Sequence, residues 1–405
     1  MRIGIIGAGA AGMFCAVNLD NTKHQITVLE KNADSLKKLL ITGHGRCNVT
    51  NLKSSNDFLD NVPHNKQFLF SSLNMFSPTN MVEFLKEKQI EVVKEDNDRI
   101  FPKSNKATTI KNCFDNMISN KVDIRFDASV SSIKWENNEF IVETNSGIYT
   151  FDAVVVATGG VTYPTTGSTG DGYKFAKLFD IDTIKPRSSL CGIRLLDIPK
   201  ELEGTPLNAK LSIVNNGKVV ASNIGEFLFT NYGVSGPNVF TLSSKTEEYS
   251  INGYKLCFDL LVNDSKECII DKLKKFSKNN PKKYIFHSVN SLVNIKIAKL
   301  ILSKCGILEN KQCANISNVE YALIADNIKA LAFDIENFDS IERATVTRGG
   351  VSVKEINPKT MESKKVKNLY FIGEVIDVDA LSGGYNLQIA FSTAFACAKY
   401  LNDLV

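Results

Sequence analysis

The chain has 405 residues, of which 43% are hydrophobic and 23% charged, an ordinary composition for a globular protein with more than one domain. Its formal net charge of +4 is too small to indicate nucleic-acid binding by itself, and no apolar run is long enough to span a membrane. The N-terminus enters a strand pattern without the basic region and cleavage site of a secretory signal. We therefore expect a cytoplasmic protein with no membrane partner.

The cysteines exclude two further classes of protein. Nine of them are scattered along the chain, an odd number, and none forms a CxxC pair. This pattern fits neither a disulfide framework nor a zinc cluster, so no metal site is predicted.

The first 30 residues form a nucleotide-binding signature. A predicted strand over residues 1–6 leads directly into Gly7-Ala8-Gly9-Ala10-Ala11-Gly12, and a helical pattern follows through Leu19. In such a motif the glycines allow a tight turn, close approach of the backbone to a pyrophosphate, and tight packing of helix on strand. A second predicted strand over 26–29 ends at Glu30, whose carboxylate can accept hydrogen bonds from ribose hydroxyls. Both NAD and FAD use this arrangement.

The stretch ITGHGRCNVTN, residues 41–51, is rich in small residues and follows the first nucleotide-binding half. Lysine is the usual cation of this chain, so Arg46 here predicts a bidentate or stacked partner, for which a pyrophosphate is the natural candidate. The spacing of a P-loop is absent. Cys47 could act as a nucleophile only with a base or a depressed pKa, and His44 is the one histidine close to it in the chain.

A second glycine-bearing corner is predicted near residue 158. Residues 151–157 (FDAVVVA) indicate a buried strand that stops at Thr158-Gly159-Gly160. Ligands of doubly wound folds bind at such carboxyl ends of parallel strands. Hairpin strands are predicted before it at 128–135 and 139–144, and Val130 falls where a backbone group could hydrogen-bond an adenine.

The C-terminal segment indicates the third corner. A strand at 368–372 ends at Gly373-Glu374, and the diglycine Gly383-Gly384 precedes a helical pattern over 387–401. A helix that begins at a diglycine presents free N–H groups and the positive end of its dipole. Such an end stabilises negative charge at the N1–C2 carbonyl edge of a flavin, which favours FAD over NAD.

The middle of the chain has a different pattern. Short strands are predicted at 191–195, 210–214, 218–221, 226–229 and 255–260, helices at 266–276, 288–303 and 318–331, and a return to the sheet at 343–353. One segment concentrates basic charge, with Phe276 and Tyr284 interleaved: Lys266, Lys272, Lys274, Lys275, Lys278, Lys282 and Lys283. Most such runs are solvated helix faces, and an RNA-binding face is the alternative.

Taken together, these segments resemble the BaiN/YhiN-like bacterial flavoproteins, also labelled aminoacetone oxidase-like or NAD(P)/FAD-dependent oxidoreductases. The blocks that carry the resemblance are GAGAAG, KKLLITGHGRCNVTN, ATGG with YPTTGSTGDGY, FLFTNYGVSGP, TRGGVSVKEINPKTMES and YFIGEVIDVDALSGGYNLQIAFSTA. The resemblance implies an α/β fold whose discontinuous Rossmann-like FAD-binding domain, residues 1–183 and 344–405, carries two inserted parts. These are a β-rich substrate-side domain, 184–263 and 332–343, and a helical insert, 264–331.

The resemblance also implies non-covalent FAD and a set of contacts to it. By position these are Gly7, Gly9, Ala11, Gly12, Glu30, Lys31, Lys38, Gly45, Arg46, Cys47, Asn48, Val130, Thr158, Gly159, Gly373, Glu374, Asp379, Gly384, Asn386 and Leu387. Two positions depart from the family pattern. Asn231 stands where many relatives have a histidine, so a role of that histidine in proton transfer cannot be transferred, and Asp180 stands where relatives commonly have a Gly-His pair.

The expected function is an FAD-dependent oxidoreductase that passes hydride from NAD(P)H to an activated C=C bond of a small molecule or of uridine in ribosomal RNA. A second glycine motif after a strand is missing, so NAD(P)H should bind transiently over the flavin. Two alternatives stay open: an amine or aminoketone oxidase that uses dioxygen, and a flavin-dependent redox or binding module that acts on a protein partner. Cys47 and Tyr163 are the candidates for the acid that protonates the substrate carbon.

Overall fold

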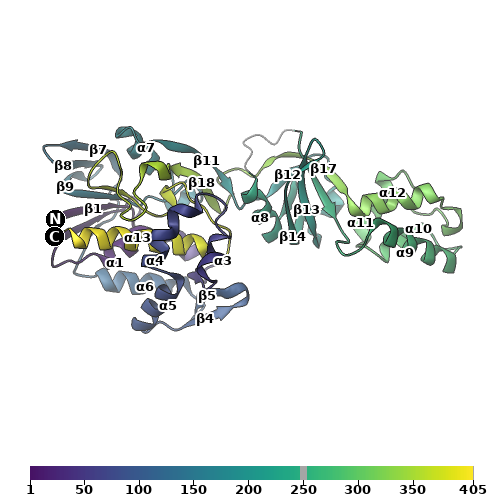
Figure 1. The fold of residues 1–405 in the computed structure, drawn as a ribbon, viewed down its shortest axis with the longest axis horizontal. Coiled ribbons are helices and arrows are strands. Elements are labelled where there is room, and N and C mark those ends of the chain that lie inside the picture. The colour runs from purple at the N-terminus through teal and green to yellow at the C-terminus, as the bar shows by residue number, and fades with distance from the viewer. Residues whose placement is uncertain (247–252, 405) are drawn as a thin grey trace. The chain divides into compact units, whose positions relative to one another are not determined.

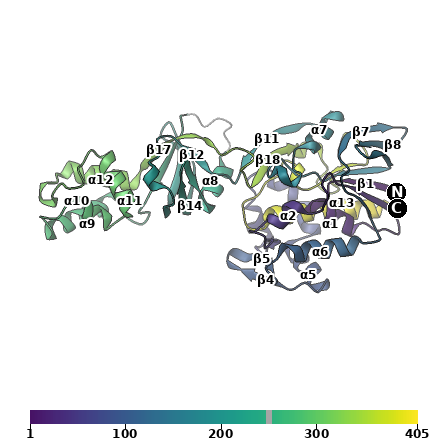
Figure 2. The same cartoon turned by 180° about the vertical axis from the view of Figure 1, so that it is seen from behind.

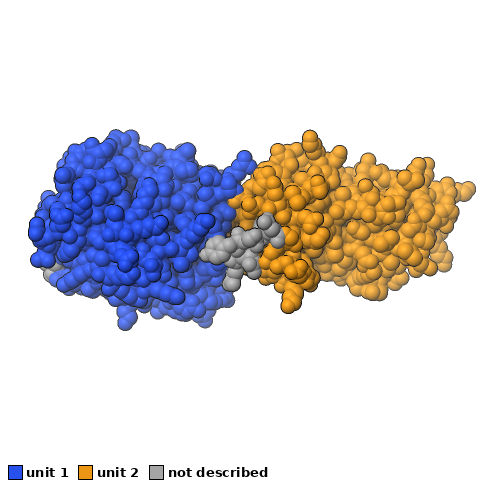
Figure 3. Space-filling model, turned by 90° about the horizontal axis from the view of Figure 1, so that it is seen from above, with its two compact units in different colours: residues 1–189, 340–405 blue, residues 190–339 orange. Residues whose placement is uncertain are grey.

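The computed structural model describes residues 1–246 and 253–404, and the chain divides into two compact units. Unit 1 contains residues 1–189 and 340–405, and unit 2 contains residues 190–339 (Figure 3). Unit 1 is therefore built from both ends of the chain, and unit 2 is inserted between them.

A parallel sheet of five strands forms the centre of unit 1, in the order β19-β10-β1-β2-β6. The strands are β1 (Arg2–Ile6), β2 (Gln25–Leu29), β6 (Asp123–Arg125), β10 (Ala153–Val156) and β19 (Leu369–Phe371). Near-continuous apolar sequence in β1 and β10 suits strands that are covered on both faces. This sheet and its helices confirm the predicted α/β class with a Rossmann-type domain.

Helices α1 and α13 lie side by side against the sheet in both ribbon views (Figures 1 and 2). The helices of unit 1 are α1 (Ala10–Asn18), α2 (Lys37–Ile41), α3 (Ser55–Leu59), α4 (Phe70–Met75), α5 (Pro78–Glu87), α6 (Ala107–Ile118), α7 (Asp171–Leu178) and α13 (Tyr385–Asp403). Three smaller sheets flank the parallel one: β3 (Thr50–Asn51) with β5 (Arg99–Pro102) and β4 (Val92–Glu95); β7 (Val130–Glu136) with β8 (Glu139–Thr144) and β9 (Gly147–Phe151); and β11 (Thr183–Ser189) with β18 (Val346–Val351).

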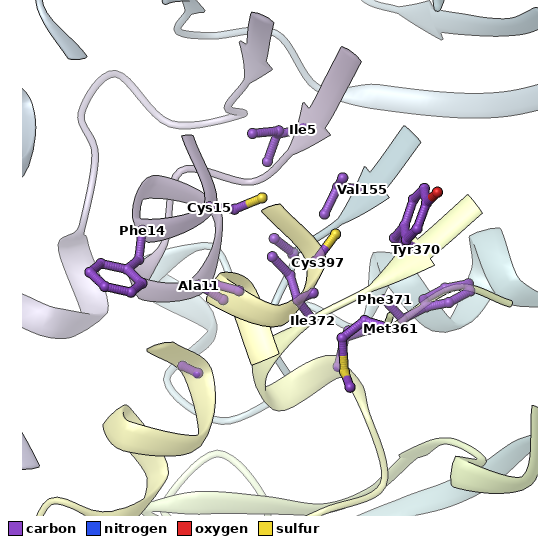
Figure 4. Packing of buried hydrophobic residues seen from close by; sticks show 14 of the residues in the cluster. Ile5, Ala11, Phe14, Cys15, Val155, Met361, Tyr370, Phe371, Ile372 and Cys397 are labelled. Atoms are coloured by element: carbon purple, nitrogen blue, oxygen red, sulfur yellow. The ribbon is translucent and has the colours of Figure 1, made fainter. Parts of the chain in front are cut away.

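The main core lies between α1, α13 and the parallel sheet. Figure 4 shows Ile5 of β1, Val155 of β10 and Cys15 of α1 together with Ile372 and Cys397, all of them buried. The ring of Phe14 lies 5.0 Å from that of Phe391 in α13. This packing fixes the glycine-rich ends of the strands relative to the two helices, because close-packed interiors tolerate little displacement.

Unit 2 is a closed six-stranded barrel with a helical part inserted before its last strand. The barrel strands are β12 (Ile193–Leu195), β13 (Pro206–Asn215), β14 (Lys218–Thr230), β15 (Gly233–Ser235), β16 (Lys255–Asp259) and β17 (Leu331–Phe338). Its helices are α8 (Pro237–Lys245), α9 (Lys266–Asn279), α10 (Ile285–Asn290), α11 (Ile295–Lys304) and α12 (Asn318–Lys329). One continuous cluster of buried side chains runs through the barrel and the helical part.

Short 3₁₀ helices connect several of these elements. They are η1 (Lys66–Leu69), η2 (Asp96–Asp98), η3 (Pro164–Thr166), η4 (Lys200–Leu202), η5 (Cys313–Asn315), η6 (Val353–Glu355) and η7 (Gly373–Val375). None of the helices in the two described stretches has both the length and the apolar sequence that a membrane crossing requires.

Several expected elements differ in the structure. The segment 151–157 is broken at Asp152, because this carboxylate binds the Arg2 amide at 2.7 Å. Residues 288–303 form two helices, since Asn294 accepts a hydrogen bond from the Lys296 amide and begins a new helix. The two short strands expected at 218–229 are one strand, β14.

The segment 343–353 is predicted to return to the sheet, and it does return to unit 1 as a strand, but not to the five-stranded sheet. Its strand β18 pairs with β11 in a separate antiparallel sheet. The strand is buried or half-buried along its whole length, and a run of this kind does not reveal which neighbouring strand it pairs with.

Candidate functional site

Four strands of the parallel sheet end at one edge, and each is followed by predicted site residues. The Gly7 amide donates to the Leu29 carbonyl at 2.9 Å, and the Ala157 amide to the Ile6 carbonyl at 2.9 Å. The Ile372 amide donates to the Val156 carbonyl at 3.1 Å. The structure therefore brings Gly7, Glu30, Thr158 and Gly373 to the same carboxyl edge, where doubly wound folds bind their ligands.

The three glycines of the first loop have different surroundings. A Cβ on Gly12 would lie 1.9 Å from the Gly7 carbonyl oxygen, and a Cβ on Gly7, whose φ is +105°, would lie 2.7 Å from the Ala157 carbonyl oxygen. A Cβ on Gly9 would meet no described atom within 4 Å. Gly9 is also the N-cap of α1 and offers no side-chain cap. Open space beside a bare helix N-terminus is a cradle that a phosphate group can fill.

Glu30 holds the loop from the next strand. Its carboxylate accepts the Ala8 amide at 2.7 Å and the Asn32 amide at 2.8 Å, and the residue is 7% exposed. Ala128, two residues before Val130, donates its amide to the Glu30 carbonyl at 2.8 Å. The ribose position and the adenine position predicted from the sequence are therefore neighbours in the fold.

The segment 42–51 packs against the N-terminus of α13. The Asn51 side chain donates to the Gly383 carbonyl at 3.0 Å, and the Thr50 hydroxyl donates to the Gln388 side chain at 2.6 Å. Gly384 is the N-cap of α13, with φ +95° and no side-chain cap. A Cβ on Gly384 would lie 2.9 Å from Asn48 Oδ1, so this corner requires glycine.

Glu374 connects the third corner to α2. Its carboxylate accepts the Lys38 ammonium at 2.7 Å and the Thr347 amide at 3.0 Å. The Gly373 amide donates to the Thr393 hydroxyl of α13 at 3.0 Å, and a Cβ on Gly373 would lie 2.7 Å from that of Ala11. Both glycine-capped helices, α1 and α13, therefore converge on this corner.

Two predicted contact residues carry buried polar atoms that lack a partner. Asn48 Oδ1 and Thr158 Oγ1 are each buried and form no hydrogen bond within residues 1–246 and 253–404. Burying such an atom without a partner costs about 1–3 kcal/mol. Together with the open space at Gly9, these orphaned atoms fit a bound polar group such as FAD.

Other predicted contacts have protein partners in the structure. The Arg46 guanidinium lies 4.1 Å from the Phe101 ring centre, pairs with Glu95 of β4 and donates to Asn105 at 2.9 Å. Arg46 does have the stacked and paired environment that its residue type predicts, but the partner is a protein carboxylate and not a pyrophosphate. Its role near the pyrophosphate therefore lacks support from its position.

Three more predicted contacts have local roles in the structure. Lys31 pairs with Asp171 at 2.7 Å. Asn386 accepts the Ala380 amide at 2.9 Å and donates back to its carbonyl at 2.7 Å, which closes the turn before α13. Leu387, which follows Asn386, is partly buried against the core of unit 1.

The two candidates for a substrate acid are unequal. Cys47 is fully buried, and burial raises the pKa of its thiol to about 12, although a hydrogen bond with Thr42 acts in the opposite direction. The arrangement disfavours a thiolate nucleophile. Tyr163 has a left-handed backbone with φ 53°, and its ring centre lies 5.7 Å from the Lys38 ammonium.

We expect Cys47 to stay unmodified when the folded protein is treated with iodoacetamide at mildly alkaline pH, because the thiol is both buried and protonated. Peptide mass spectrometry measures the modification, and the same protein unfolded in urea serves as the control that Cys47 can react. Modification in the folded protein at the rate of the unfolded control would contradict this assignment.

Sequence reasoning missed one group of polar residues beside Asp379. The buried Asp379 carboxylate accepts hydrogen bonds from the His64 ring at 2.8 Å and from the Ser189 hydroxyl at 2.8 Å. The three positions are far apart in the chain, and no local motif joins them. The only available signal was the rarity of histidine, of which the chain has four.

Comparison with known proteins gives matches over nearly the whole chain. The family described as HI0933-like protein Rossmann domain matches residues 1–400. The chain is 32% identical to "Ribosomal RNA dihydrouridine synthase" of Haemophilus influenzae, over 97% of this chain and 96% of that protein. It is 26% identical to "3-dehydro-bile acid delta(4,6)-reductase" of Clostridium scindens, over 98% of each.

Among solved structures, 3-ketosteroid delta1-dehydrogenase from Sterolibacterium denitrificans superposes with a TM-score of 0.52 at 12% identity. The alignment covers 100% of this chain and 99% of that one. At this identity the similarity concerns the fold alone.

Proposed function

Because the chain belongs to the HI0933-like protein Rossmann domain family, we propose that it is an FAD-dependent reductase that passes hydride from NAD(P)H to an activated C=C bond, and that its substrate is uridine in ribosomal RNA. Membership confirms the resemblance to BaiN/YhiN-like flavoproteins and the class of flavin-dependent oxidoreductase. A cytoplasmic location is part of the proposal, since NAD(P)H and ribosomal RNA are both found there.

The observation that carries the proposal is the convergence of the glycine-bearing corners on one sheet edge. The N-terminus of α1 at Gly9 would hold the pyrophosphate, and Glu30 would hold a ribose. The N-terminus of α13 at Gly384 would stabilise negative charge on the flavin ring. Bound FAD supplies hydride transfer, and the protein supplies placement and electrostatics.

The names of both relatives describe reduction of carbon–carbon double bonds. Forming dihydrouridine adds two hydrogens across the C5=C6 bond of uracil, and a delta(4,6)-reductase acts on double bonds of a bile acid. Two proteins with the same fold and the same kind of cofactor site can carry out the same reaction on different substrates.

The helical part of unit 2 favours RNA over a small molecule. We define the lysine face as Lys274, Lys275, Lys278, Lys282 and Lys283, all exposed, and none forms an ion pair within the described residues. In helix α9, which carries the first three of these lysines, Lys266 pairs with Asp326 and Lys272 with Asp264. Tyr284, 47% exposed, lies next to Lys283 in the chain and offers a ring on which a base can stack. Unpaired lysines beside an exposed aromatic ring suit a phosphate backbone.

The test is anaerobic stopped-flow spectroscopy of the FAD-loaded protein. We expect NADH or NADPH to bleach the flavin absorbance, unmodified ribosomal RNA to restore it, and mass spectrometry of the RNA to find a uridine that has gained two hydrogens. Peroxide release with small amines and air would instead support an amine oxidase. Reaction with neither would leave the protein-partner alternative, and a protein that takes up no FAD would contradict all three.

A further inference from the structure

A buried carboxylate, predicted only as an FAD contact, binds two polar residues that sequence reasoning missed. Asp379 is 1% exposed and lies on the segment between η7 and the diglycine that begins α13. Its two oxygens are used separately: Oδ1 binds the Nδ1 atom of His64 at 2.8 Å, and Oδ2 accepts the Ser189 hydroxyl at 2.8 Å. Each oxygen of the buried carboxylate thus has a hydrogen-bond partner, which a charge removed from water requires.

The segment that carries His64 is fastened to the Asp379 segment on both sides. The Leu381 amide donates to the Asn61 carbonyl at 2.8 Å. On the other side, the Asn65 side chain donates to the Asp377 carbonyl at 2.6 Å and to the Asp377 carboxylate at 3.0 Å. His64 therefore has little freedom to leave the loop that leads into Gly383 and Gly384.

This geometry decides which ring nitrogen is available. A carboxylate can only accept a hydrogen bond, so the Nδ1 atom of His64 is protonated and donates its hydrogen bond to Asp379. Nε2 then forms no hydrogen bond within residues 1–246 and 253–404, and it is not among the buried unpartnered atoms. A histidine oriented through Nδ1 with Nε2 accessible is a common arrangement for proton transfer.

The charged groups around the ring are few. Asp379 contacts it directly from the segment before α13, and Asp377 lies on the same segment. Arg348 of β18 acts electrostatically on Asp377. Desolvation raises the pKa of the Asp377 carboxyl, and the hydrogen bond from Asn65 lowers it.

We propose that His64 is the acid of the reduction: its Nε2 gives the proton to the substrate carbon next to the one that receives hydride, and Asp379 and Ser189 position the ring. This inference rests on the proposed function. NAD(P)H supplies the hydride and becomes NAD(P)⁺, the π bond of the substrate breaks, and two C–H bonds form. In the reacting form the imidazole carries a proton on both nitrogens. Nε2 gives its proton to the substrate carbon, the ring becomes the neutral form protonated at Nδ1, and a proton from solvent restores Nε2–H, so each cycle consumes one NAD(P)H and one proton.

The first experiment separates proton transfer from cofactor function. In His64→Gln we expect reoxidation by unmodified ribosomal RNA transcript to slow by about 100- to 10,000-fold, the usual contribution of a general acid. FAD affinity and the rate of bleaching by NADPH should stay within about twofold, because neither step needs this proton. The matched control is His287→Gln, which removes an exposed histidine of α10 and should leave FAD affinity and bleaching unchanged.

The second experiment locates the ring without using activity. Diethyl pyrocarbonate modifies accessible imidazole nitrogens, and peptide mass spectrometry reports each histidine separately. We expect His64 to be modified in the protein without FAD and to be shielded several-fold when FAD binds, whereas His287 reacts equally in both. Equal modification of His64 with and without FAD would overturn the inference.

A positioning variant covers the case in which His64→Gln fails to fold. Ser189→Ala removes one partner of Asp379 and leaves the histidine in place. We expect it to lower the rate of RNA-dependent reoxidation without changing the KM for the RNA. Unchanged reoxidation in a folded His64→Gln, or in Ser189→Ala if only that variant folds, would overturn the inference while the proposed function stands. A wild-type protein that binds no FAD would overturn both.

Discussion

Replacing Gly9 by valine is expected to weaken FAD binding by about 5- to 150-fold, the equivalent of the roughly 1–3 kcal/mol that overpacking usually costs. A side chain at this position points into space that no described atom occupies, with φ −79°, so the protein itself should accept it. The cost arises only when a phosphate group approaches the N-terminus of α1. Titration of the protein with FAD, followed by flavin fluorescence, measures the dissociation constant. Thermal unfolding without FAD should change only by the small amount that valine costs at an N-cap.

Gly12→Ala is the matched control within the same loop. Its Cβ would lie 1.9 Å from the Gly7 carbonyl oxygen, so strand β1 and helix α1 must separate whether or not FAD is present. We expect this variant to lower the unfolding temperature of the protein without FAD by much more than Gly9→Val does. Equal effects of the two variants on stability, or unchanged FAD affinity in Gly9→Val, would contradict the assignment of the phosphate to Gly9.

Neutralising the lysine face is the second large expected effect. Replacing Lys274, Lys275, Lys278 and Lys282 by glutamine should reduce the slope of log K against log salt for ribosomal RNA by about 3, since each phosphate contact contributes about 0.7–0.9. When the salt concentration rises from 50 to 200 mM, the variant should therefore lose about 60-fold less RNA affinity than the unmodified protein, according to the same relation. Filter binding of an unmodified ribosomal RNA transcript over a salt series provides the measurement, and NADPH-driven bleaching should be unaffected.

Helix α9 provides a control with the same change in charge. The double variant Lys274→Gln with Lys278→Gln removes two unpaired charges, and Lys266→Gln with Lys272→Gln removes two that already pair with Asp326 and Asp264. If the lysine face binds phosphates, the first pair should reduce the salt slope by about 1.5 and the second by much less. Equal slopes for both doubles would indicate a general charge effect and contradict a defined RNA face.

Local sequence predicted the elements that carry their own signals. The glycines at 7, 9 and 12 indicated a strand, a turn and a helix, and the structure has β1 and α1 there. The diglycine at 383–384 predicted a helix start, and α13 begins at Tyr385. These residues act through their own backbone, so their requirement for glycine can be recognised without any knowledge of distant neighbours.

Predictions that depended on distant partners were less successful. Asp152 interrupts an apolar run because Arg2, 150 residues earlier, binds it. The residue type of Arg46 indicated a bidentate or stacked contact, but nothing in the stretch 41–51 revealed that Glu95 and Phe101 would supply it. An arginine needs a planar acceptor or an aromatic face, and both a pyrophosphate and a protein side chain satisfy that need.

The amino-acid sequence by itself determined the family, the α/β class and the glycine-bearing corners, because these follow from short segments with strict backbone requirements. Only the tertiary structure decided that Asp379 meets His64 and Ser189, and that Gly9 alone among Gly7, Gly9 and Gly12 faces open space. It also decided that the five lysines of the lysine face have no carboxylate partner among residues 1–246 and 253–404. The physical reason is the distance along the chain over which each kind of interaction acts. Backbone conformation is set by neighbours along the chain, whereas hydrogen bonds, ion pairs and free space are set by whichever segments the packed core brings together.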